Sequence, residues 1–409
     1  MGRPSENCDV VIIGAGPAGA LAAKRLADEG VSVILLEKSR FPRFVIGESL
    51  LPQSMAFLER AGLIDVLDGA GFQQKTGANF SDGTRYSSID FSDKFTKGWA
   101  RTWQVPREKF DSLLAAEAER AGTELHFECD VESVEFAAGT AVVSGHSSAA
   151  EFRINCRFVV DASGYGRVLP RLLDLDRPSD FPVREALFTH VEDNLAGTDF
   201  DRNKILIAVH PEIQDIWYWL IPFAAARASV GVVAPARYLA GKGENNEDIL
   251  HCLIDEMPDL KRLLRDAKDC RPAGRITGYS AGVSRLTGPG FALLGNAGEF
   301  LDPVFSSGVT IAFKSADLLI DPLMRELAGE TVDWEKDFSN PLKRGVDCFR
   351  TFVEAWYDGS LQKIIFNPPE GDNMIRKMIV SVLAGYAWDD ENPFVTRGRH
   401  YLDVVAAQC

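Results

Sequence analysis

The sequence predicts an α/β fold in which a doubly wound parallel sheet is combined with an interleaved antiparallel sheet and a helical C-terminal region. Three observations predict it. A strand, a glycine-rich turn, a helix and a second strand follow one another over residues 9–37. Runs of β-branched and aromatic residues fill residues 186–235, which is typical of antiparallel strands. The pattern of residues 331–409 indicates mainly helices.

The unit over residues 9–37 has the features of a dinucleotide-binding turn. The apolar strand Val10–Ile13 leads directly into Gly14-Ala15-Gly16-Pro17-Ala18-Gly19, and a helical segment follows. Gly14 allows the tight turn, Gly16 lets the backbone approach a pyrophosphate, and Gly19 lets the helix pack closely on the strand. Glu37 ends the second strand, where a carboxylate can bind both hydroxyls of an adenosine ribose. An ordinary βα turn does not explain this glutamate, so the sequence predicts dinucleotide binding.

Composition and charge exclude several other classes of protein. The chain has 409 residues, of which 46% are hydrophobic and 25% charged, and this is ordinary for a globular protein of two domains. Its net charge of −15 argues against binding nucleic acid or anionic lipid. The polar N-terminus and the short apolar stretch Met378–Trp388 predict a cytoplasmic protein without a membrane span. The cysteines form no CxxC pair or metal-ligand cluster, so we expect free thiols and no metal.

Two later strands end in similar glycine turns. Phe158–Asp161 is followed by Ala162-Ser163-Gly164, and Phe291–Leu294 is followed by Gly295-Asn296-Ala297-Gly298. Ligands of doubly wound folds bind at the carboxyl edge of the sheet, so we expect all these turns to lie together there. A helix predicted from Thr310 to about Ala328 brings another N-terminus to the same place.

The remaining pattern gives the expected domain boundaries. Further helices are predicted at residues 54–61, 108–121 and 247–266, the last interrupted at Pro258. The expected domains are a discontinuous nucleotide-binding domain (1–70, 103–178 and 273–330), a substrate domain (71–102 and 179–272) and a helical C-terminal region (331–409).

Together these stretches resemble the FAD-dependent monooxygenase-like superfamily and, within it, the flavin-dependent halogenases, over most of residues 9–320. The resemblance implies a Rossmann-type, glutathione-reductase-like FAD-binding domain. Asn296 stands where the family usually has Asp, and its amide oxygen can still accept a hydrogen bond from a ribityl hydroxyl. The residues that the resemblance assigns to FAD are Gly14, Gly16, Ala18, Gly19, Glu37, Lys38, Arg43, Gly47, Glu48, Ser49, Arg107, Ala162, Ser163, Gly164, Gly295, Asn296, Gly308 and Val309.

Two motifs carry the resemblance to halogenases. Trp217-x-Trp219-x-Ile221-Pro222 matches W-x-W-x-I-P, although Ile216 stands where tryptophan halogenases usually carry Gly. Phe300-x-x-Pro303-x-x-Ser306-x-Gly308 matches a second motif that accompanies halide chemistry. Lys75, which alone reads as a surface residue, falls where the family keeps its catalytic lysine. The residues assigned to the halide and the flavin cavity are Ser306, Ser307, Gly308, Trp217, Trp219 and Pro303.

The resemblance implies a two-component reaction. A separate reductase supplies FADH2, which with O2 oxidises chloride or bromide to hypohalous acid. Backbone N–H groups at Ser307 and Gly308 can hold the halide, and Lys75 delivers an electrophilic halogen to an aromatic ring. Phe305 replaces the Glu of tryptophan halogenases, which favours a phenol or a pyrrole, often one presented on a carrier protein.

Two other functions stay open from the sequence alone. One is a flavin reductase of the geranylgeranyl-reductase type, or a related FAD monooxygenase, which shares the fold but has no need of Lys75. The other is a catalytically altered flavoprotein that only binds or carries flavin. Asn296 and Ile216, which differ from the residues usual in the family, slightly favour it. The sequence contains no second Rossmann fingerprint, so a built-in NAD(P)H site is not expected under any of the three.

Overall fold

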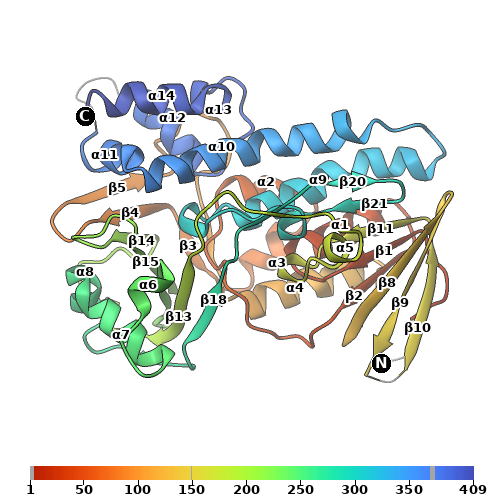
Figure 1. The fold of residues 1–409 in the computed structure, drawn as a ribbon, viewed down its shortest axis with the longest axis horizontal. Helices are drawn as coiled ribbons and strands as arrows, with labels where there is room; N and C mark the ends of the chain where they lie inside the picture. Colours follow the sequence, from red (N-terminus) through yellow and green to blue (C-terminus); the bar gives the residue numbers. More distant parts are fainter. Residues whose placement is uncertain (1–3, 149, 369–373) are drawn as a thin grey trace.

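The computed structural model describes residues 4–148, 150–368 and 374–409. The chain forms a parallel sheet covered by helices, a second large sheet beside it, and a group of C-terminal helices that lies along the top of the view in Figure 1. The predicted fold class is confirmed. The division of the chain into domains stays a prediction.

The parallel sheet has the strand order β20-β21-β11-β1-β2-β7, with β20 antiparallel at one edge. Both β1 and β11 are buried along their whole length, which explains their continuous apolar runs. Ile13 pairs with Leu36 on one side and Asp161 on the other, and Asp161 pairs with Leu293. The strands therefore end level with one another, and the turns that follow them lie together. The bounds are β1 Val10–Ile13, β2 Val33–Glu37, β7 Glu124–Phe127, β11 Phe158–Asp161, β20 Thr287–Gly288 and β21 Phe291–Leu293.

Three long helices pack beside this sheet. Helix α1 (Pro17–Asp28) packs against both α4 (Arg107–Arg120) and α9 (Gly308–Leu327). Helix α9 begins at Gly308, two residues earlier than predicted, so Ser307 is its N-cap residue and Gly308 its first residue. The shorter helices are α2 Gln53–Arg60, α3 Ile64–Asp68 and α5 Val168–Leu172.

The second large sheet has the order β17-β13-β16-β15-β14-β4-β5, with β18 also paired to β13. The antiparallel strands predicted within residues 186–235 are present, and β14 in addition pairs parallel with β4. Lys75 ends a short strand that pairs with β6 rather than with this sheet. The bounds are β3 Gln73–Lys75, β4 Gly77–Ser81, β5 Tyr86–Asp90, β6 Thr102–Gln104, β13 Glu185–Glu192, β14 Lys204–Val209, β15 Trp217–Phe223, β16 Arg227–Ala234, β17 Lys268–Asp269 and β18 Gly274–Thr277.

The remaining elements are a small hairpin sheet, a few short strands and helices, and the helical C-terminal region. A three-stranded hairpin sheet leads away from the parallel sheet at the right of Figure 1, and two helices meet at Pro258 as the sequence indicated. The predicted helical region after residue 330 is present, with α10 as its longest helix. The bounds are β8 Cys129–Ala137, β9 Thr140–Ser147, β10 Glu151–Cys156, β12 Asp176–Pro178, β19 Ala281–Val283, α6 Ala236–Leu239, α7 Asn246–Glu256, α8 Pro258–Leu263, α10 Asn340–Tyr357, α11 Ser360–Phe366, α12 Met374–Leu383, α13 Pro393–Thr396 and α14 Gly398–Ala406.

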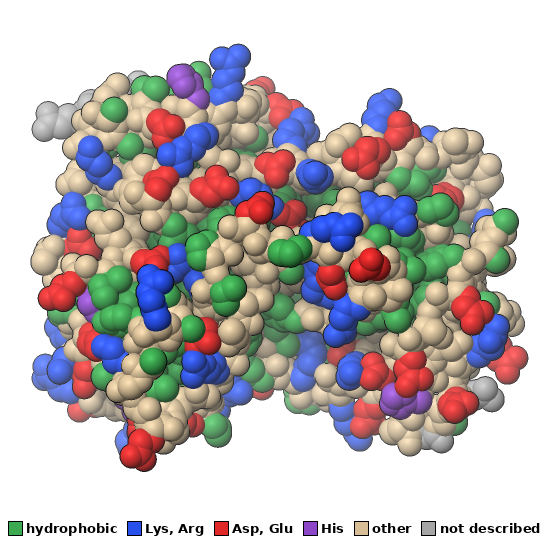
Figure 2. All heavy atoms as spheres, in the orientation of Figure 1, with side chains coloured by type: hydrophobic (Ala, Val, Ile, Leu, Met, Phe, Trp, Pro, Cys, Tyr) green, Lys and Arg blue, Asp and Glu red, His purple; other side chains and the backbone are tan. Residues whose placement is uncertain are grey.

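The surface carries charges of both signs. On the face shown in Figure 2, Lys and Arg side chains are interspersed with Asp and Glu. Within the described part of the chain, no helix combines the length and the apolar character that crossing a membrane requires.

Candidate functional site

A cavity of about 470 Å³ lies at the carboxyl edge of the parallel sheet, with further walls from β14 and β15 of the second sheet. The structure brings most of the predicted site residues together around it. Gly19, Lys75 and Ser307 are the predicted residues that do not line it. Those that do are Gly14, Gly16, Ala18, Glu37, Lys38, Arg43, Gly47, Glu48, Ser49, Arg107, Ala162, Ser163, Gly164, Trp217, Trp219, Gly295, Asn296, Pro303, Ser306, Gly308 and Val309.

The turn before α1 leaves space where a pyrophosphate would bind. A Cβ atom built on Gly16 would have Arg43 Nη2, at 3.6 Å, as its nearest described neighbour, so this backbone faces open cavity. Helix α1 has no side-chain cap among the described residues and no acidic residue in its first turn. Its first N–H groups and the positive end of its dipole therefore remain available to an anion.

Glu37 is fixed by backbone donors at the edge of the cavity. The N–H of Ala15 donates to its Oε2 and the N–H of Ser39 to its Oε1, each at 2.9 Å. The Arg43 guanidinium lies 3.6 Å from Oε1. These partners hold the carboxylate in one orientation, and each oxygen keeps a lone pair for a ribose hydroxyl.

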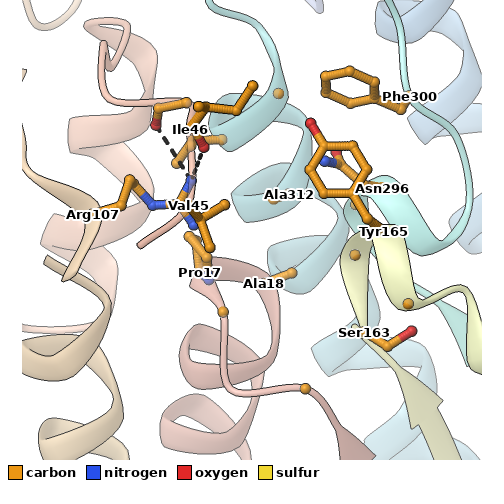
Figure 3. A pocket seen from close by; sticks show the side chains of 18 of the residues that line it. Pro17, Ala18, Val45, Ile46, Arg107, Ser163, Tyr165, Asn296, Phe300 and Ala312 are labelled. Carbon is orange, nitrogen blue, oxygen red and sulfur yellow. Dashed lines mark hydrogen bonds between the residues drawn. The ribbon is translucent and has the colours of Figure 1, made fainter. Parts of the chain in front are cut away.

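A buried ion pair shapes the loop of residues 43–49. Arg107 donates to both oxygens of Asp111, at 2.8 and 2.9 Å, and Arg43 donates to Asp111 Oδ2 at 3.0 Å. Arg107 Nη1 also donates to the carbonyl oxygens of Ile46 (3.0 Å) and Gly47 (3.3 Å), as Figure 3 shows. Arg107 was predicted at this site and Asp111 was not, although its spacing of four residues from Arg107 in a helix was a readable signal.

The opposite wall consists of the two later glycine turns and the start of α9. Buried Asp161 holds the first of these turns by accepting from the N–H groups of Ser163 (2.8 Å) and Leu169 (2.6 Å). Burial raises the pKa of Asp161. Asn296, Tyr165 and Phe300 lie across the cavity from Arg107 in Figure 3.

Two tryptophans of β15 form the wall toward the second sheet. Trp217 and Trp219 point to the same side of the strand, and their ring centroids are 5.8 Å apart. Trp219 Nε1–H donates to Ser229 Oγ at 3.1 Å. Trp219 pairs across the sheet with Gly231, where a Cβ atom would lie 2.3 Å from the indole, so only glycine leaves room for this ring.

A buried pair of ionisable groups at the cavity was only half predicted. Glu48 was predicted, and its Oε1 lies 2.6 Å from His190 Nε2, with both side chains buried. The ring of His190 lies edge-on to Phe44 and Phe223. His190 lies in an apolar run of β13, and nothing in its local sequence marks it as part of a site.

Lys75 is buried just behind the cavity wall. Its side chain is 1% exposed, and its amine donates to Ser49 Oγ at 2.7 Å and to the Leu50 carbonyl oxygen at 2.9 Å. The amine also lies 5.3 Å from the centre of the Phe91 ring. Within the described part of the chain no carboxylate pairs with it, and burial lowers the pKa of Lys75 to about 7. Ser49, which lines the cavity, is therefore the group that connects the amine to it.

Comparisons with known proteins identify the family. A sequence profile described as an FAD binding domain matches residues 7–227. The chain is 28% identical over 406 residues to the 1H-pyrrole-2-carbonyl-(peptidyl-carrier protein) chlorinase of Pseudomonas fluorescens, covering 93% of this chain and 89% of that one. The structure of a flavin-dependent brominase is 27% identical, covers 97% of this chain and 99% of its own, and superposes with a TM-score of 0.83. The chain belongs to the family of proteins with this FAD binding domain, and it is similar to flavin-dependent halogenases over nearly its whole length.

A solved structure with higher identity has a less specific description. It is a flavoprotein/dehydrogenase from Cytophaga hutchinsonii, 42% identical, with 98% of each chain covered and a TM-score of 0.94. The residues of this chain fit FAD, because its open backbone at Gly16 and the fixed carboxylate of Glu37 lie along one cavity. The assignment of individual residues to FAD stays a prediction.

A side chain at Gly16 should prevent FAD from binding. Gly16→Val would place three carbon atoms in the space that the pyrophosphate needs, so we expect the purified variant to contain no flavin. The flavin-to-protein ratio after gel filtration measures this. Gly197→Ala, at a position with open space around it, is the control and should keep its flavin. A folded Gly16→Val protein with full flavin content would show that the turn is only structural.

Gly231→Ala should weaken FAD binding through Trp219. The new methyl group would push the indole toward the cavity, at a cost of about 1–3 kcal/mol, which is typical of overpacking. Titration of apoprotein with FAD measures the loss of affinity. The double variant Gly231→Ala, Trp219→Phe, with a smaller ring, should recover only part of it, because the new Cβ atom would still lie 2.6 Å from the carbonyl oxygen of Leu187. Equal losses in the single and double variants would contradict this explanation.

Lys75 should make stability depend on pH. The folded-state pKa of about 7 lies below the ordinary lysine value of 10.5, so at pH values between the two only the unfolded state binds this proton. The free energy of unfolding therefore rises with pH in this window, by up to about 1.4 kcal/mol per pH unit. Below the folded-state pKa the buried lysine is charged, and its burial then destabilises the folded protein most. Urea denaturation of wild type and Lys75→Met from about pH 6 to about pH 10 measures the difference. A constant difference across this range would show that Lys75 stays charged in the folded protein.

Proposed function

We propose that this protein halogenates an electron-rich aromatic compound, a phenol or a pyrrole, with FADH2, O2 and chloride or bromide. The observation that carries the proposal is the amine of Lys75, buried without a carboxylate partner in the described structure and hydrogen-bonded to Ser49 of the cavity loop. A lysine with a structural role would be expected to have an acidic partner or to extend into solvent. Neither holds for Lys75, so a catalytic role explains its burial better than a structural one.

When bound, reduced FAD from a separate reductase would supply the two electrons with which O2 oxidises a halide ion to hypohalous acid, with water as the second product. The chain itself provides an anion site for the halide at the start of α9. Ser306 has a left-handed backbone with a φ of 58°, Ser307 is the N-cap residue, and no described side chain caps the helix. The N–H groups at Ser307 and Gly308 are therefore suited to hold an anion beside the cavity.

Lys75 would then pass the halogen to the aromatic ring. With a pKa of about 7, the lysine exists both as ammonium and as amine near neutral pH. The ammonium can donate a hydrogen bond to the oxygen of hypohalous acid, and the amine can form a haloamine with loss of water. Either route leaves the electrophilic halogen on the protein side of the substrate, away from solvent.

Phe305 supports a phenol or a pyrrole as the substrate. Its side chain is buried and packs edge-on against Trp356, with ring centroids 5.6 Å apart. The apolar side chain of Phe305 cannot act as a base that removes a proton from the substrate. A phenol or a pyrrole has less need of such a base, because its own hydroxyl or ring nitrogen activates the ring carbon atoms. The chlorinase relative, whose substrate is a pyrrole on a peptidyl-carrier protein, makes a carrier-bound substrate the first to test.

A reductase of the geranylgeranyl-reductase type is the second candidate. The absence of Lys75 from the cavity lining and the flavoprotein/dehydrogenase at 42% identity favour it. Anaerobic incubation separates the two, because a reductase oxidises FADH2 with an alkene and without O2, whereas a halogenase requires O2 and halide. Halide-independent reduction of an isoprenoid would overturn the halogenase proposal.

Lys75→Ala should separate flavin oxidation from halogenation. The variant should bind FAD and consume O2 as the wild type does, yet lose product formation by at least about 100-fold, because the halogen carrier is missing. Lys75→Arg should fail similarly, since a guanidinium does not lose a proton to form a haloamine. Product is measured by mass spectrometry with a carrier-bound pyrrole and a panel of phenols.

The matched control is Lys204→Ala, which removes another hydrogen-bonded lysine, one that contacts Ser88. It should retain product formation. Equal product yields from the wild type and Lys75→Ala would remove this lysine from the mechanism.

A further inference from the structure

A buried carboxylate behind the cavity binds two tyrosines that the proposed halogenation does not use. Asp302 is 2% exposed, and its Oδ2 accepts hydrogen bonds from the phenols of Tyr357 (2.7 Å) and Tyr279 (2.9 Å). The N–H of Val304 donates to its Oδ1 at 3.1 Å. These residues come from the loop before α9, the segment after β18 and the end of α10, so the fold assembles the cluster from distant parts of the chain.

One of these tyrosines is linked directly to the cavity wall. Trp217 Nε1–H donates to the hydroxyl oxygen of Tyr357 at 2.9 Å, and the indole of Trp217 lines the cavity. Tyr279 lies edge-on to Phe300, another lining residue, at 5.8 Å between ring centroids. A continuous series of oxidisable rings and hydrogen bonds therefore runs from the cavity to Asp302.

The same tyrosine also reaches toward the outside of the protein. Tyr357 is partly exposed, whereas Trp217 is buried. The guanidinium of Arg184 lies 3.7 Å from the centre of the Tyr357 ring and pairs with Asp215, whose side chain is 36% exposed. Tyr357 is thus less buried than Trp217, Tyr279 and Asp302 and is the member of the cluster nearest to solvent.

The hydrogen bonds have the direction that proton-coupled oxidation of a phenol requires. A phenol that loses an electron becomes a strong acid and must give up its proton, and Asp302 already accepts the hydrogen bond from Tyr357. Burial raises the pKa of Tyr357 well above its usual value, so the proton resides on the phenol until an electron leaves. We propose that Trp217, Tyr357 and Asp302 form a relay that draws one-electron oxidising equivalents out of the cavity and passes them to a soluble thiol.

The relay transfers one electron and one proton in three steps. A one-electron oxidant in the cavity, either an oxygen- or halogen-centred radical or flavin excited by light, takes one electron from the Trp217 indole. Tyr357 returns an electron to the indole and transfers its phenolic proton to Asp302. A thiolate in solution then reduces the tyrosyl radical and is itself oxidised to a thiyl radical, while the proton returns from Asp302 to the phenol oxygen.

A cavity in which FADH2 meets O2 gives this relay a purpose. Without Tyr357, an oxidised Trp217 would remain in the cavity wall and react there with O2 or water. The relay instead transfers the oxidising equivalent from Trp217 to Tyr357, where a reductant can remove it. It requires bound flavin and oxygen chemistry in the cavity, but not halide or Lys75.

A light flash on the holoprotein tests the relay directly. Blue light excites oxidised FAD, and transient absorption should show a neutral tyrosyl radical in the wild type, formed more slowly in D2O. Tyr357→Phe should lose this radical and retain a longer-lived tryptophan radical. Tyr218→Phe is the matched control, since Tyr218 is next to Trp217 in β15, is buried, and has no hydrogen-bond partner among the described residues. It should behave as the wild type.

A second variant keeps the test independent of how Tyr357→Phe folds, and a chemical readout adds a measurement that needs no light flash. Trp217→Phe should also abolish the tyrosyl radical. After turnover with FADH2, O2 and glutathione but no halide, peptide mass spectrometry should find several-fold more oxidised Trp217 in Tyr357→Phe than in the wild type. A tyrosyl radical that persists in both variants, or equal Trp217 oxidation in wild type and Tyr357→Phe, would overturn the relay and leave the cluster with a structural role. Neither measurement involves halide or a halogenated product. A failure of the proposed halogenase activity would therefore be distinguished from a failure of the relay.

Discussion

The close meeting of backbone turns at the carboxyl edge of the parallel sheet is the constraint on which the site depends. A Cβ atom on Gly14 would lie 2.6 Å from the carbonyl oxygen of Ala162, and one on Gly19 would lie 1.9 Å from the carbonyl oxygen of Gly14. Side chains at these positions would separate β1 from β11 and lift α1 from the sheet. Because the strands end level, the edge of the sheet consists mostly of backbone from the turns that follow them. The cavity lies directly against these turns.

From that edge, one loop carries the polar groups of the site toward the second sheet. Arg107 and Arg43 share the buried carboxylate of Asp111, and Arg107 also holds the loop's carbonyl oxygens. The same loop then places Glu48 against His190 and Ser49 against the amine of Lys75. The Glu48–His190 pair and the amine of Lys75 are therefore linked through adjacent residues of a single loop. A shift of this loop would change the surroundings of both groups together.

Local sequence patterns predict the backbone of this protein better than its side-chain networks. The strands, the glycine turns and Glu37 could be predicted because each rests on a short motif with one physical explanation. His190 and Tyr357 could not, because their partners Glu48 and Trp217 lie 142 and 140 residues away in the sequence and only the fold brings them close. Lys75 lies between these cases. Its neighbours indicate a surface position, and only the resemblance to halogenases drew attention to it.

Arg107 and Lys75 show two different ways of burying a cation beside the same cavity. Arg107 cannot give up its proton, so it requires Asp111, and the pair is stable because nearly every donor faces an oxygen. Lys75 has only a hydroxyl, a carbonyl and an aromatic ring as neighbours among the described residues, and none of these cancels a full charge. Burial is tolerable there because the amine can release its proton near pH 7. An arginine in that place would remain charged, and an acidic partner would fix the lysine as ammonium. The unpaired lysine is thus the one arrangement of the three that leaves a nucleophilic nitrogen just behind the cavity wall.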